Sequence, residues 1–153
     1  MAAPNPDAAT ERMLAIWSTP QGFVKAAMAN KAVTKKGKNN TTDGSFTLPG
    51  GQKMAGVINA KGEVEKVQFW IYQSIVGDML VETTYAGYRD FGGVMFPARI
   101  TQTQDGFPSL DITVSGVMAN PAVDIAVPQN VRAFQPPPVK VDSQKMADGV
   151  YYL

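Results

Sequence analysis

The sequence predicts an α+β domain in which N-terminal helices pack on a curved antiparallel β-meander. In the first thirty residues the apolar positions recur at helical spacing, whereas from Ser45 onward they alternate with polar positions. The connections between the predicted strands are short turns that leave no room for crossover helices, so the strands are expected to run antiparallel. The helices are then expected to cover one face of the sheet.

Two short helices are predicted ahead of the sheet. The first begins at segment 5–7, whose Asn-Pro-Asp order supplies a cap, a first-turn proline and an early acid. Its apolar stripe consists of Met13, Leu14, Ile16 and Trp17. The second helix begins with Thr19 as its cap, and Asn30 suits its C-terminal end. Its apolar stripe consists of Phe23, Val24, Ala27 and Met28.

Alternating segments predict the strands. In the segment "EVEKVQFWIY", one face carries Val67, Phe69 and Ile71, and the other carries Lys66, Gln68, Trp70 and Tyr72. The pattern continues in the segments "LVETTYAGYRDF", "GVMFPARITQTQ" and "SLDITVSGVM". Pro97 cannot donate to a β-ladder, which predicts an edge or a bulge at that point.

The pattern loosens from Pro121, and three prolines at 136–138 predict an extended spacer. We therefore expect a helix-plus-sheet domain over residues 1–134, followed by a linker and one strand over 135–153. Two outcomes are open for that final strand: it frays, or it folds back onto the sheet as an added edge. We favour docking of residues 139–141, with weaker order beyond Ser143.

The composition argues against catalysis or metal binding by this chain. The 153 residues include neither histidine nor cysteine, which removes the commonest general base and the preferred zinc ligands. We therefore expect no catalysis, no cofactor and no bound metal. A net charge of +1 provides no field that would attract nucleic acid. No apolar run is long enough to span a bilayer, and the N-terminus lacks the features of a signal peptide.

The short motifs in the sequence are interpreted mainly as structural features. Asp90-Phe91-Gly92 matches a kinase metal motif, but no other kinase element accompanies it, so a hairpin turn is predicted. The lysines at 35, 36 and 38 are interpreted as a solvated loop. The aromatic residues are interpreted either as ordinary packing or as a face that binds an apolar ligand or a partner. That predicted face consists of Trp70, Tyr72, Tyr85, Tyr88 and Met95.

Three segments carry a family resemblance: "WSTPQGFVKAAMAN", residues 77–128, and "VKVDSQKMADGVYYL". Together they resemble the region ahead of the catalytic domain in bacterial metallo-β-lactamase-fold hydrolases. The resemblance implies that "ADGVYYL" opens the first strand of the hydrolase domain, with the HxHxDH zinc motif farther on. It therefore implies a non-catalytic N-terminal domain that packs against its own C-terminal hydrolase domain or shapes access to it.

The resemblance places zinc in that catalytic domain, and it implies a periplasmic or secreted parent protein. No catalytic residue of the family maps onto this sequence. The helices and meander are also similar to the curved half-barrel of LolA-like periplasmic lipoprotein carriers, a likeness of fold alone. The alternative function is therefore a periplasmic carrier or binding module for an apolar ligand or a lipoprotein.

Overall fold

A computed structural model describes residues 8–75, 77–133, 135 and 142–152. One compact unit ends at Ala122, and a second begins at Val123. The boundary that we predicted at residue 134 therefore lies inside the second unit. The prolines at 136–138 and the predicted docking segment 139–141 lie outside the described residues.

The first unit contains a seven-stranded antiparallel meander in which each strand pairs with the next one along the chain. Its strands are β1 (Val33–Lys36), β2 (Thr42–Thr47), β3 (Lys53–Ile58), β4 (Val64–Gln73), β5 (Gly77–Asp90), β6 (Met95–Gln104) and β7 (Phe107–Thr113). A short 3-10 turn, η1 (Lys38–Asn40), joins the first two strands. The predicted α+β class and antiparallel topology are confirmed.

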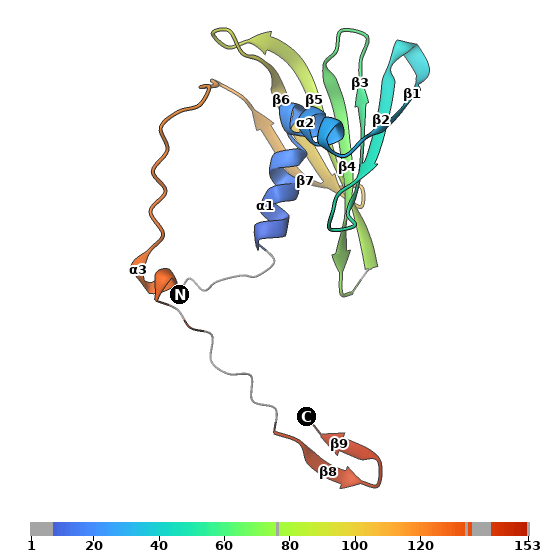
Figure 1. Cartoon of the computed structure of the whole chain (residues 1–153), viewed down its shortest axis with the longest axis vertical. Helices are drawn as coiled ribbons and strands as arrows, with labels where there is room; N and C mark the ends of the chain where they lie inside the picture. Colours follow the sequence, from blue (N-terminus) through green and yellow to red (C-terminus); the bar gives the residue numbers. More distant parts are fainter. Residues whose placement is uncertain (1–7, 76, 134, 136–141, 153) are drawn as a thin grey trace. The chain divides into compact units, whose positions relative to one another are not determined.

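Two helices, α1 (Ala8–Trp17) and α2 (Pro20–Ala29), lie on one face of this sheet (Figure 1). The side chain of Thr19 caps α2 by accepting a hydrogen bond of 3.2 Å from the Gly22 amide. Asn30 ends α2 and donates from both its backbone and its side chain to the Ala26 carbonyl. Both predicted cap residues are confirmed, whereas the predicted start of the first helix at 5–7 lies outside the described residues.

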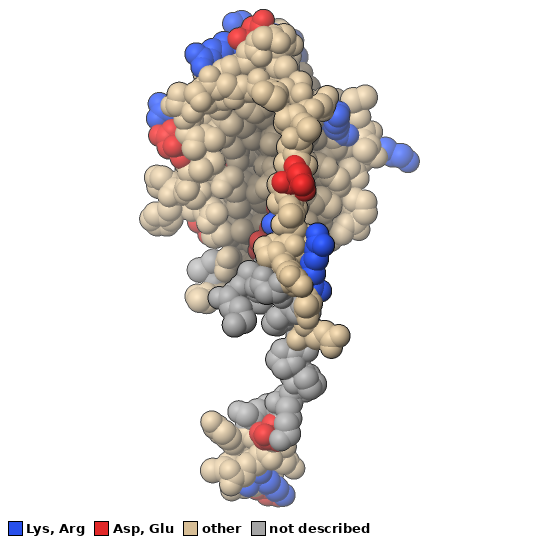
Figure 2. All heavy atoms as spheres, turned by 90° about the vertical axis from the view of Figure 1, so that its left-hand side faces the viewer, with Lys and Arg blue, Asp and Glu red and all other residues tan. Residues whose placement is uncertain are grey.

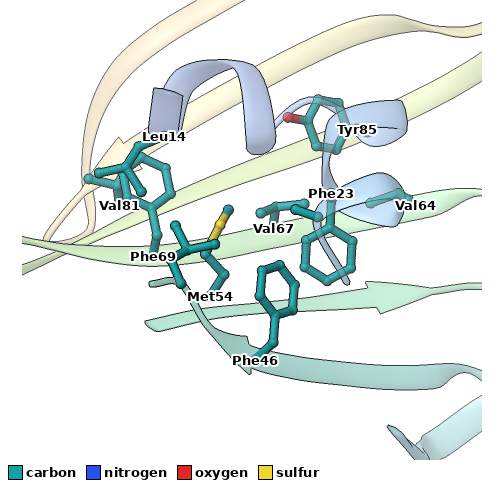
Figure 3. Close-up of a cluster of buried hydrophobic side chains, with 11 residues drawn as sticks. Leu14, Phe23, Phe46, Met54, Val64, Val67, Phe69, Val81 and Tyr85 are labelled. Carbon is teal, nitrogen blue, oxygen red and sulfur yellow. The ribbon is translucent and has the colours of Figure 1, made fainter. Parts of the chain in front are cut away.

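The core fills the space between the two helices and the strands (Figure 3). Val67 and Phe69 are buried there as predicted, and Ile71 packs partly buried against the same cluster. The ring of Phe23 lies 5.5 Å from that of Phe46, centroid to centroid. It also lies directly over Gly56, where an added Cβ would come within 2.5 Å of the ring. Glycine at this position lets the helix approach the sheet.

Pro97 lies where the ladder with β7 has not yet begun. It pairs with Tyr88 on the β5 side, but the pairing of β6 with β7 starts two residues later, at Arg99. Next to Tyr88 in β5, Gly87 has a φ of 64°, a conformation that glycine adopts without strain. The predicted interruption at Pro97 is thus present as a local edge, next to an irregular residue in β5.

The second unit contains α3 (Gln129–Arg132) and a two-stranded sheet made of β8 (Gln144–Ala147) and β9 (Val150–Tyr152). Asp148 and Gly149 form the turn between its strands, with Gly149 at a φ of 75°. Our expectation that the final strand frays or joins the main sheet was wrong for the described residues. β9 pairs with β8, because a turn-forming Asp-Gly pair makes a local partner available.

Candidate functional site

A cleft of about 560 Å³ lies between α1 and the inner face of strands β4 to β7. Figure 2 looks onto a hollowed face of the molecule whose visible walls carry mainly uncharged side chains. The apolar residues that line the cleft include Leu14, Phe69, Ile71, Val81, Ile100 and Ile112. Clefts of this volume and lining are typical of sites for small apolar molecules.

Strand alternation builds the apolar wall of the cleft. On each strand every second residue faces inward, so Ile100 on β6 and Ile112 on β7 meet as direct cross-strand partners. Leu110 and Ile112 each keep 42% of their surface exposed, because the two helices cover only part of the inner face. These two side chains therefore form an open apolar wall.

Uncharged polar groups line the rest of the cleft. The Gln102 amide donates to the Thr83 hydroxyl at 3.0 Å, and the Ser109 hydroxyl donates to the Gln102 side-chain oxygen at 3.3 Å. Gln104 also borders the cleft. Among the described lining residues, Glu11 carries the one formal charge, and none is Lys or Arg. The cleft therefore provides hydrogen bonds without a cation.

Two tyrosines of β5 donate long-range hydrogen bonds, one to the corner between the helices and one to strand β4. Tyr85 donates to the main-chain carbonyl of Ser18, and Tyr88 donates to the carbonyl of Val64 at 2.7 Å. Burial raises the pKa of Tyr85 to about 12, although the hydroxyls of Thr83 and Ser18 partly oppose that shift. Burial is also the main cause that raises the pKa of Tyr88, followed by the nearby Tyr85 and Glu63.

The five residues of the predicted ligand face do not form one surface. Trp70 and Tyr72 lie on the side of β4 opposite to Phe69 and Ile71, away from the cleft. Tyr85 borders the cleft, while Tyr88 and Met95 lie beside α2.

Aliphatic side chains of β6 and β7 form apolar lining of the cleft instead. Ile100, Leu110 and Ile112 belong to the alternating segments that predicted these strands, but they were not predicted as a binding surface. The signal for them was the alternation of apolar and polar residues in these strands.

The Asp90-Phe91-Gly92 motif is part of a hairpin turn, as predicted. Asp90 ends β5, and its carboxylate accepts a hydrogen bond of 2.6 Å from the Gly93 amide. Gly92 has a φ of 72°, which a turn requires and glycine permits. The motif therefore has a structural explanation. Of the three lysines interpreted as a loop, Lys35 and Lys36 lie instead in the exposed edge strand β1.

Within the described ranges, no cluster of three or more acidic, histidine or cysteine residues could hold a metal ion. The helices that the structure describes are too short or too polar to cross a membrane. Comparisons with family models, with curated proteins and with solved structures gave no match for this chain.

Proposed function

We propose that this chain is a non-catalytic binding domain that holds an apolar group in the cleft under α1. The observation that carries the proposal is the open wall formed by Leu110 and Ile112, two strand residues that face the cleft and remain half-exposed. Covering such a wall with an apolar ligand removes surface from water at about 25 cal/mol per Å². On the helical side of the cleft, Leu14 of α1 is buried and adds apolar surface.

We further propose that this binding domain is the N-terminal accessory domain of a metallo-β-lactamase-fold hydrolase. The resemblance of three sequence segments supports this proposal, and so does the strand β9, which forms where the resemblance expects the first hydrolase strand. An isolated two-stranded hairpin is marginally stable in water, so β8 and β9 gain from joining a larger sheet. The exposed side chains of Tyr151 and Tyr152 provide apolar surface for such an addition.

In that setting the zinc chemistry belongs to the catalytic domain, and the cleft shapes access by holding the apolar part of a substrate. The proposal places the parent protein in the periplasm or outside the cell. The reading frame that encodes this chain tests the assignment. We expect an HxHxDH motif downstream in the same frame. A frame that closes at Leu153, or continues without zinc ligands, would contradict the assignment and leave the binding function standing.

The alternative is a periplasmic carrier that works alone, with the inner face of a LolA-like half-barrel as its binding surface. The half-exposed wall formed by Leu110 and Ile112 supports this alternative, because a carrier must exchange its cargo with other proteins. Both functions require an apolar ligand in the cleft. They differ in whether a zinc hydrolase is encoded in the same frame.

Fluorescence of the uncharged probe N-phenyl-1-naphthylamine tests the binding function directly. We expect saturable enhancement with the native chain, and at least tenfold weaker binding after Ile112→Asp, which places a charge on the open wall. Thr113→Asp is the matched control, because it adds the same charge to the other face of β7. Equal binding of the probe by both variants would show that the probe does not bind in the cleft.

A further inference from the structure

We infer that the cleft selects ligands with an uncharged head group, such as a monoacylglycerol, over alkyl carboxylates of the same chain length. This inference rests on the proposed binding function and adds the chemical class of the ligand. Its basis is the distribution of charge around the cleft rather than the shape of the cleft.

The first step concerns the cost of an anionic head group. A carboxylate that leaves water needs a cation or several hydrogen-bond donors in compensation. The described lining contains no Lys or Arg, and its one formal charge is the acidic Glu11. An alkyl carboxylate would therefore lose hydration, gain repulsion from Glu11 and find only neutral donors such as the amides of Gln102 and Gln104 in compensation.

The second step concerns what the cleft offers instead. The amide of Gln102 is held between the hydroxyls of Thr83 and Ser109, so its orientation is fixed. Gln104 faces the same space at the end of β6, beside β7. Primary amides both donate and accept hydrogen bonds, which matches the hydroxyls and ester of an uncharged head group.

Displacement of N-phenyl-1-naphthylamine by monolaurin and by laurate at pH 8 tests the inference. These two competitors share a chain length and differ in the charge of the head group. With the native chain, we expect monolaurin to displace the probe at a concentration at least tenfold lower than laurate does. Laurate acting at an equal or lower concentration would overturn the inference while leaving the binding function intact.

A charge added inside the cleft provides the second arm of the test. Gln104→Lys should improve displacement by laurate at least fivefold, with little change for monolaurin. Thr103→Lys is the matched control, because it adds the same charge on the opposite face of β6 and should leave the preference unchanged. Equal gains in both variants would show that net charge, not the cleft, sets the preference and would overturn the inference. Failure of the native chain to bind the probe would remove the proposed binding function together with this inference.

Discussion

The hydroxyl of Tyr85, in the middle of β5, donates a hydrogen bond to the main-chain carbonyl of Ser18, at the corner between α1 and α2. Ser18 keeps only 5% of its surface exposed, so its carbonyl has little access to water. The bond joins residues 67 positions apart in sequence. It links the helices, which form one side of the cleft, to the sheet, which forms the other side. We therefore expect the position of α1, and hence the shape of the cleft, to depend on this contact.

Removing that hydroxyl should loosen the helices. Tyr85→Phe leaves the Ser18 carbonyl buried without its partner, a change that costs about 1–3 kcal/mol of unfolding free energy. Urea denaturation followed by circular dichroism measures the loss. Tyr72→Phe is the control, because Tyr72 is 77% exposed on the other face of the sheet and should change stability by less than about 0.5 kcal/mol. Equal losses in the two variants would contradict the anchoring role of Tyr85.

Alkaline pH should weaken the hydrogen bond from Tyr85 to the Ser18 carbonyl. Burial raises the pKa of Tyr85 to about 12, above its ordinary value, so the folded chain holds this proton more tightly than the unfolded chain does. The resulting stability is fully present below about pH 10 and is lost as the pH rises toward about 12.

A shift of this size corresponds to roughly 2–3 kcal/mol. The measurement is the unfolding free energy of the native chain and of Tyr85→Phe, compared from pH 8 to pH 12. We expect the advantage of the native chain to shrink across that range. Parallel curves would show that the Tyr85 proton is not linked to folding.

Truncating the Phe69 side chain, which lines the cleft, should destabilise the domain strongly. Phe69 is buried between the helices and the sheet, so Phe69→Ala should cost about 3–5 kcal/mol. Glu65→Ala, at an exposed position of the same strand, should stay within about 0.5 kcal/mol. Chemical denaturation compares the two variants, and similar losses would mean that the register of β4 differs from the one described.

The close approach of α2 to β3 predicts a cost for a single methyl group. Gly56→Ala would place its Cβ 2.5 Å from the Phe23 ring and 2.9 Å from the Lys66 carbonyl, so the helix must shift. We expect a loss of about 1–3 kcal/mol in thermal or urea unfolding. Gly116→Ala is the matched control, since no atom lies within 4 Å of its added Cβ. A neutral Gly56→Ala would show that this contact is looser than described.

Local rules predicted the helices and the order of the strands. Thr19 and Asn30 act at α2 through their own side chains, and the alternation from Val67 to Ile71 depends only on strand geometry. Irregular strand positions were harder to predict. Tyr85 and Tyr88 both face the core although three positions separate them, because the positive φ of Gly87 breaks the alternation.

The candidate site was not predicted from the sequence, for a related reason. Aromatic residues drew attention, although alternation already placed Trp70 and Tyr72 on the face of β4 opposite to Phe69 and Ile71, and that face points away from the cleft. The inward direction of Ile100 and Ile112 was predictable from alternation. Their exposure was not, because it depends on how far two short helices reach across the sheet, a tertiary property.

Methyl NMR during a titration with monolaurin tests most directly whether the cleft under α1 is the functional surface. We expect the signals of Ile100, Leu110 and Ile112 to shift with one common dissociation constant. The signal of Ile75, which is 93% exposed at the end of the β4–β5 hairpin, should stay in place. Unchanged signals from the three cleft residues, or shifts confined to residues outside the cleft, would contradict the account.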